Sequence, residues 1–172
     1  YMELFHKYKC IPSKYVKIAT ILVSINIFLF SILSISLLIK APTLNAWIGN
    51  LLFISVLLVY LRTCAFYPRY ISLSKESLVL KCLFTTKSFK YQDIDYIKKG
   101  FKVRGIRRFG SNGVWGYIGI IDADNKYHTL FNNEKQIIEF SYRNKVYLIS
   151  CEQYEEVIKE VDKLIVSQSK KY

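Results

Sequence analysis

Six basic residues lie close together in this 172-residue chain, with no acidic residue among them. They are Lys98, Lys99, Lys102, Arg104, Arg107 and Arg108, and the apolar residues Phe101, Val103, Ile106 and Phe109 are interspersed with them. In a β-strand, such alternation places the charged side chains on one face and the apolar side chains on the other. The cluster therefore predicts a basic surface. Two interpretations stay open: the surface docks on anionic groups, or it is a solvated face.

The chain as a whole carries a net charge of +12. Nucleic acid and an anionic membrane surface both attract such a protein. Near an anionic leaflet each basic residue contributes roughly 1 kcal/mol, so six would bind with several kcal/mol. We favour lipid headgroups as the partner of the cluster, because the apolar segments described below would hold the chain at a bilayer. Nucleic acid is the less favoured partner.

Other residues that could do chemistry lack the neighbours that the chemistry needs. His128 has no serine or cysteine nearby with a recognisable base partner, so it is expected to be packed or solvated. Asp93 and Asp95, like Asp122 and Asp124, form D-x-D pairs, but a calcium loop would need further oxygen ligands. The sequence therefore predicts no catalytic, metal-binding or cofactor-binding residue, and we expect a protein that is not an enzyme.

The four cysteines form no C-x-x-C pair, and the chain has only two histidines, so no zinc-binding spacing occurs. They are Cys10, Cys64, Cys82 and Cys151. We expect free thiols on the reducing side of a membrane. Cys10 and Cys64 flank the apolar segments and are also candidates for lipidation.

The longest apolar segment runs from Ile18 to Ile39 and contains no charged residue, with Lys17 and Lys40 on either side. As a helix its 22 residues would reach about 33 Å, enough for a hydrocarbon core of about 30 Å. A buried core helix seldom lacks charge for six turns, and a signal peptide would have a shorter apolar run. This segment is therefore predicted to span a membrane, with Asn26 facing a neighbouring helix.

A second apolar segment, Ala46–Leu61, follows after a short polar turn. The two segments predict a transmembrane helical hairpin over residues 18–61. Asn50 is expected to pair with Asn26 or with a serine, if the two side chains lie at the same depth in the membrane. Small residues should allow the helices to approach closely; they are Ser31, Ser34, Gly49 and Ser55.

The basic residues near the hairpin predict its orientation. Lysines precede the first span, Arg62 and Arg69 follow the second, and the connecting turn has only Lys40. The positive-inside rule then places both termini in the cytoplasm. Residues 1–17, in which lysines and aromatic residues are interleaved, are expected to form an interfacial segment.

From Tyr70 onwards the pattern changes to short alternating runs, which predict antiparallel strands. The expected strands are 70–74, 77–83, 87–91, 94–97, 117–121, 126–131, 136–141 and 145–149. The glycines between Gly105 and Gly119 indicate a bulge or sharp bend, and Trp115 among them is expected to be a core residue rather than an exposed one. Ser150 to Gln153 has the form of a capping box before an amphipathic helix with acidic residues in its first turn, and 167–172 is a polar tail.

Two stretches carry a family resemblance. Arg107-Arg108-Phe109-Gly110-Ser111-Asn112-Gly113-Val114-Trp115-Gly116-Tyr117-Ile118-Gly119 resembles the R-x-F-G-S-G-G-x-F-G-x-x-G segment of bacterial PH-domain proteins. Tyr147-Leu148-Ile149-Ser150 resembles their Y-x-I-S-P junction, although Cys151 replaces the proline and Asn112 the middle glycine. Over residues 70–165 the resemblance implies a pleckstrin-homology fold, a bent seven-stranded sheet closed by a C-terminal helix. It implies no common enzymatic activity.

We therefore predict an α+β protein: a transmembrane hairpin at 18–61 and a PH-like antiparallel barrel or sandwich at 70–166, capped by a C-terminal helix. The predicted role is binding or scaffolding at the cytoplasmic face of a bacterial inner membrane, through a protein partner or through lipid at the basic cluster. The alternatives are an accessory subunit of a membrane enzyme or transport complex, and a nucleic-acid-binding module. The Ser74–Ser77 loop, where eukaryotic PH domains bind phosphoinositides, has only Lys75, so no phosphoinositide pocket is expected.

Overall fold

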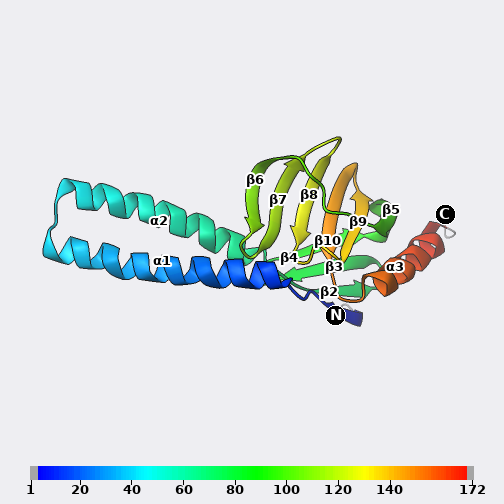
Figure 1. Cartoon of the computed structure of the whole chain (residues 1–172). Helices are drawn as coiled ribbons and strands as arrows, with labels where there is room; N and C mark the ends of the chain where they lie inside the picture. The colour runs from blue at the N-terminus through cyan, green and yellow to red at the C-terminus, as the bar shows by residue number, and fades with distance from the viewer. Residues whose placement is uncertain (1–3, 170–172) are drawn as a thin grey trace.

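The protein has two parts, a long helical hairpin and a sheet-rich domain (Figure 1). A computed structural model describes residues 4–169. In chain order the elements are β1 (Leu4–Lys9), α1 (Lys14–Lys40), α2 (Leu44–Ala65), β2 (Pro68–Ser74), β3 (Ser77–Cys82), β4 (Thr86–Lys90), the short 3-10 helix η1 (Tyr91–Asp93), β5 (Ile94–Lys99), β6 (Ile106–Gly113), β7 (Gly116–Asp122), β8 (Lys126–Phe131), β9 (Ile137–Tyr142), β10 (Lys145–Ser150) and α3 (Tyr154–Ser169). The predicted α+β class is confirmed.

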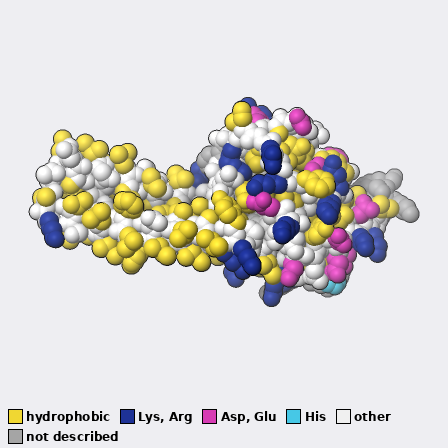
Figure 2. Space-filling model, viewed as in Figure 1, with side chains coloured by type: hydrophobic (Ala, Val, Ile, Leu, Met, Phe, Trp, Pro, Cys, Tyr) yellow, Lys and Arg dark blue, Asp and Glu magenta, His cyan; other side chains and the backbone are white. Residues whose placement is uncertain are grey.

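Helices α1 and α2 are antiparallel and project together from the domain (Figure 1). Both are long and apolar enough to cross a membrane, and no residue in the most apolar 18-residue window of either is buried. Figure 2 shows hydrophobic side chains spread over their visible surface, while most charged side chains gather on the domain. A core helix of a soluble protein would be buried, so these helices indicate association with a membrane.

Polar contacts join the helices at two places. The Ser24 hydroxyl lies 2.6 Å from the Tyr60 hydroxyl. The Ser34 hydroxyl donates to Asn50 Oδ1 at 2.5 Å, and Asn50 Nδ2 donates to the Ser34 carbonyl oxygen at 3.5 Å. The predicted pairing of Asn50 with a serine is thus confirmed. The prediction that Gly49 lies at the helix contact is wrong, because no atom lies within 4 Å of the position where its Cβ would be.

The domain consists of two sheets packed face to face. The four-stranded sheet has the order β1-β2-β3-β4, and the six-stranded sheet has the order β5-β9-β10-β8-β7-β6. All strand pairs are antiparallel except β8 and β10, which are parallel, because β10 inserts between β8 and β9. The described residues thus form ten strands rather than the seven that the resemblance implied.

The first strand corrects the expectation for residues 1–17. Leu4–Lys9 pairs with β2 at the edge of the four-stranded sheet and does not form a separate interfacial segment. The physical reason is that Tyr8 has a place in the core, where only 4% of it is exposed. The domain therefore begins before the hairpin and continues after it. Residues 1–3 lie outside the described part of the chain.

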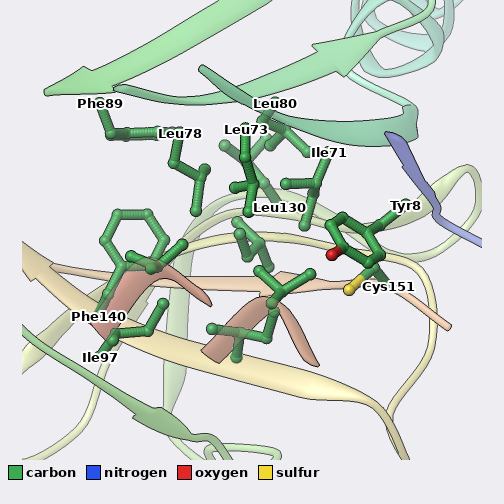
Figure 3. Packing of buried hydrophobic residues seen from close by; sticks show 14 of the residues in the cluster. Tyr8, Ile71, Leu73, Leu78, Leu80, Phe89, Ile97, Leu130, Phe140 and Cys151 are labelled. Carbon is green, nitrogen blue, oxygen red and sulfur yellow. The ribbon is translucent and has the colours of Figure 1, made fainter. Parts of the chain in front are cut away.

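The main core lies between the two sheets and under α3. Leu73, Leu78 and Leu80 of the first sheet face Leu130 and Phe140 of the second (Figure 3). Val157 and Val161 of α3 are fully buried against the same cluster, which confirms the predicted apolar face of that helix.

Asn132, just after β8, connects the N-terminal strand to the rest of the domain. Its fully buried side chain donates to the carbonyl oxygens of Cys10 and Pro68, at 3.1 and 3.2 Å. Ser150 accepts from the Asn132 backbone N–H and donates to its side-chain oxygen. Ser150 is therefore not the N-terminal cap predicted for α3. The helix begins at Tyr154, and its first backbone bonds go to the carbonyl of Gln153.

Helix α3 continues to Ser169, so the predicted polar tail begins inside the helix. Residues 170–172 lie outside the described part of the chain.

The tip of the β6–β7 hairpin attaches the domain to the helices. The Trp115 backbone N–H donates to the Thr20 hydroxyl at 2.8 Å, and the half-buried Trp115 ring packs against Tyr60 and Tyr67. Trp115 therefore fixes the tip at the base of the helical hairpin, in addition to packing against the main core. Val16, in the first turn of α1, is buried in a second cluster formed mainly by the six-stranded sheet.

Candidate functional site

The structure separates the six residues of the predicted basic cluster. Lys98 and Lys99 end β5, whereas Arg107 and Arg108 lie in β6. These strands form opposite edges of the six-stranded sheet. The cluster is therefore not one alternating strand, and Ile106 is 78% exposed instead of buried.

Several of the cluster's charges have partners in the domain. Ion pairs join Lys98 to Glu139 at 3.1 Å, Lys102 to Glu134 at 2.8 Å, and Arg108 to Asp122. Lys99 lies over the Tyr154 ring, 5.4 Å from its centre. Exposed pairs of this kind contribute between 0 and about 1 kcal/mol each, so they leave the basic side chains able to bind other anions.

Strand β6 is the part of the sheet closest to the helical hairpin, and β5 lies on the far side of the domain (Figure 1). Arg107 and Arg108 thus lie on the side from which the helices leave, while Lys98 and Lys99 lie away from it. Position relative to the hairpin thus separates a near pair, Arg107 and Arg108, from a far pair, Lys98 and Lys99.

A pocket of about 400 Å³ lies between α2 and β6, and we call it the arginine pocket. It is lined by Val59, Arg62, Thr63, Phe66, Arg107, Arg108, Gly110 and Ile118. Arg62 comes from the last turn of α2, at the point where the apolar segment ends. The sequence analysis used Arg62 only to orient the hairpin. Its position directly after an apolar run was the signal that could have placed it beside a headgroup region.

The arginine pocket combines positive charge with apolar walls. Arg107 is partly buried and donates to the Ile118 carbonyl oxygen at 3.1 Å. Burial lowers the pKa of Arg107, but an arginine remains charged at neutral pH. Three arginines line the pocket, and one of them, Arg108, is paired with the carboxylate of Asp122. The planar donors of arginine match the oxygens of a phosphate, and Val59 and Phe66 suit the apolar part of a lipid.

A second basic pocket, of about 720 Å³, lies where α1 begins. Lys14 and Tyr15 of α1, Lys102, and the Asn133–Lys135 loop contribute to it. Lys102 also lies over the Tyr117 ring, 4.9 Å from its centre. Basic side chains therefore lie at the base of both helices.

Three residues considered for catalysis or metal binding, His128, Asp93 and Asp95, make contacts within the domain. The His128 ring stacks on Tyr147 with 5.0 Å between the ring centres. Asp93 pairs with Arg143 at 2.8 Å, and Asp95 accepts a hydrogen bond from Ser141 at 2.6 Å. Within residues 4–169, no group of three or more His, Cys, Asp or Glu side chains could hold a metal ion.

The cysteines are buried and unpaired. Burial raises the pKa of the Cys151 thiol to about 12 and that of Cys10 well above its usual value, so neither is a ready nucleophile. Because Cys10 and Cys64 are buried, their sulfur atoms are not accessible for the lipidation considered above.

A family model for the bacterial PH domain matches residues 69–165, more than half of the chain. The chain belongs to the bacterial PH domain family. The match covers β2 to α3, including the β6–β7 hairpin whose sequence carried the resemblance, and leaves out β1 and both long helices. No curated protein and no solved structure matches the chain. Membership supports a binding or scaffolding module in general terms.

Proposed function

We propose that this protein is a non-enzymatic binding module of a bacterial inner membrane, and that it holds the phosphate of an anionic lipid in the arginine pocket. The observation that carries the proposal is the convergence of Arg62, Arg107 and Arg108 where the apolar helices leave the domain. Chemistry that suits a phosphate thus lies next to a surface that suits acyl chains.

The charge distribution supports a cytoplasmic domain. Lys14 and Lys17 precede the apolar part of α1, and Arg62 and Arg69 follow that of α2, whereas the turn between the helices has only Lys40. The positive-inside rule favours both termini in the cytoplasm. From Ile21 to Lys40, α1 extends about 30 Å, which matches a hydrocarbon core. The base of the hairpin, with its arginine pocket, would then lie at headgroup level.

Lipid at this position would hold the domain flat against the leaflet. The free edge of β6 faces the same side as the hairpin (Figure 1), so a headgroup in the pocket would contact both the membrane helix and the domain. The lipid would therefore stabilise one orientation of the surfaces that remain exposed to the cytoplasm. Protein partners would bind to these surfaces.

The test uses the full chain in a nonionic detergent, with thermal unfolding measured as short-chain phosphatidylglycerol or phosphatidylcholine is added. We expect phosphatidylglycerol to raise the melting temperature by several degrees in low salt and by less in high salt. Arg62→Gln combined with Arg107→Gln should remove most of this shift. Lys98→Gln combined with Lys99→Gln is the matched control, since it removes the same charge from the far edge of the sheet.

Three outcomes would contradict the proposal. They are equal shifts with both lipids, a shift that survives the arginine substitutions, and a shift that is lost in the lysine control. Glycerol phosphate without acyl chains is added separately. If it reproduces the full shift, the pocket binds free phosphate and not lipid.

A further inference from the structure

Asn26 is a polar side chain on the lipid-facing surface of α1. Its side-chain Nδ2 donates to the Leu22 carbonyl oxygen of the same helix at 2.8 Å. Among residues 4–169 this is the only hydrogen bond of the Asn26 side chain, so its Oδ1 atom and its second N–H have no partner. The Asn26 side chain is exposed and makes no bond to α2, so the neighbouring helix that the sequence predicted for it is not α2 of the same chain.

The carboxamide of Asn50, in the apolar part of α2, behaves differently. Asn50 donates to the Ala46 carbonyl oxygen at 3.0 Å and accepts from the Ser34 hydroxyl, so both ends of its amide are used inside the hairpin. In hydrocarbon an unsatisfied polar group is costly, and intramembrane polar residues face protein. The exposed Asn26 amide thus indicates that something covers this face of α1.

A shallow apolar groove of about 360 Å³ lies beside Asn26, between the two helices. Leu22, Asn26 and Phe30 line it from α1, and Phe53 and Val56 line it from α2. The groove can receive apolar side chains of another helix, and Asn26 supplies one polar group at its rim.

We propose that two copies of this chain pack in the membrane through this face of α1, with their Asn26 carboxamides hydrogen-bonded to each other. The argument for a second copy is the chemistry of the amide. Each Asn26 has an unused amide oxygen and one unused N–H, so two of them related by a twofold axis can exchange a pair of hydrogen bonds. The proposal rests on the membrane placement of the hairpin given above.

Oxidative cross-linking tests whether the Asn26 side of α1 forms the contact between the two copies. Leu33 lies seven residues after Asn26 on the same side of α1, and Ile35 lies nine residues after it on the opposite side. Both are about half exposed, at 54% and 58%. The full chain carrying Leu33→Cys or Ile35→Cys is reconstituted alone in phosphatidylcholine vesicles, and the chain without an added cysteine is the blank. We expect a disulfide-linked dimer with Leu33→Cys and little above the blank with Ile35→Cys.

Substitutions at Asn26 test the contact. Adding Asn26→Leu to Leu33→Cys should weaken dimerisation about tenfold, because the polar interaction is lost while the apolar face remains. Asn26→Gln, which keeps the carboxamide, should restore much of it. Equal cross-linking at both cysteine positions, a monomer at all protein-to-lipid ratios, or no effect of Asn26→Leu would overturn the proposal.

A failure of the dimer proposal can be distinguished from a failure of the proposed lipid binding. Flotation of the vesicles reports whether the hairpin is inserted. A Leu33→Cys chain that also carries Arg62→Gln and Arg107→Gln should cross-link as well as the chain with Leu33→Cys alone. A floating, monomeric protein that still shows the phosphatidylglycerol shift would refute the dimer alone.

Discussion

His128 links the stability of the domain to pH. Partial burial lowers its pKa below the usual value, and the nearby charges of Lys145, Lys87 and Lys126 lower it further. The folded state therefore favours the neutral form of the ring, which stacks on Tyr147. The unfolded chain takes up a proton as the pH falls below about 6.5, so stability present above that value is lost on acidification.

We expect His128→Phe to reduce this pH dependence, because phenylalanine keeps a ring on Tyr147 and has no proton to bind. Between pH 7.5 and 5.5 the unmodified chain should lose more unfolding free energy than the variant, by less than about 1 kcal/mol for a partly buried group. Thermal unfolding of both chains at the two pH values measures the difference. Parallel pH profiles would show that His128 does not contribute.

The basic residues show what a position within the fold adds to a charge. Arg107 and Lys98 belong to one run in the sequence, yet the structure places them on opposite edges of a sheet. Arg62, 45 residues before Arg107, lines the same pocket. The arginine pocket, on the near side of the domain, combines such charges with apolar walls.

Among the elements, the β6–β7 hairpin has the most demanding backbone. Gly110 has φ +112°, and a Cβ there would lie 1.7 Å from the Ile118 carbonyl oxygen. Gly113 has φ +107°, and a Cβ there would lie 2.6 Å from the Tyr15 ring of α1. The glycines therefore allow the tip to turn and to approach the helix closely.

Two glycine substitutions test this docking. We expect Gly113→Ala to destabilise the full chain by about 2 kcal/mol, because alanine is strained at positive φ and displaces Tyr15. Gly49→Ala is the control, since open space surrounds that position of α2 and alanine favours a helix. Thermal unfolding in one detergent compares them. A Gly113→Ala chain as stable as the Gly49→Ala chain would show that the tip does not need a glycine there.

At the scale of the molecule, the domain closes around the start of the helical hairpin. Strand β1 precedes α1 and pairs with β2, which follows α2. Val16, buried in the second cluster, fixes the first turn of α1 in the domain. The helices are therefore continuous with the core and not attached to it by a linker, so the orientation of the domain follows that of the hairpin.

This continuity predicts which parts of the chain fold on their own. Replacing residues 28–55 by a short glycine-serine linker keeps the Ser24–Tyr60 contact and the Trp115 docking site, and should give a soluble, cooperatively unfolding protein. A 69–172 fragment lacks β1 and the burial of Tyr8 and Val16, and should be less stable by about 3 kcal/mol or more. Circular dichroism melts compare the two. Equal melting temperatures would contradict the structural role of residues 4–16.

Local patterns were enough to predict most elements. Charge-free runs, period-two alternation and the 154–165 amphipathic pattern predicted both helices of the hairpin, most strands and the C-terminal helix, because these features depend on neighbours a few residues apart. The family resemblance at Arg107–Gly119 predicted the fold of the domain, which the family match confirms. The sequence left two partners open for Asn50, namely Asn26 or a serine at the same depth in the membrane, and the structure shows Ser34 as the partner.

Contacts between distant segments required the folded chain. The pairing of β1 across the hairpin, the role of Ser150 beside Asn132, the docking of Trp115 and the meeting of Arg62 with Arg107 all join residues far apart in sequence. No periodicity records which edge of a sheet a strand will occupy or which side chains will meet there. Those choices follow from how the two sheets bury their apolar faces around the base of α1 and α2, and that packing is a property of the whole chain.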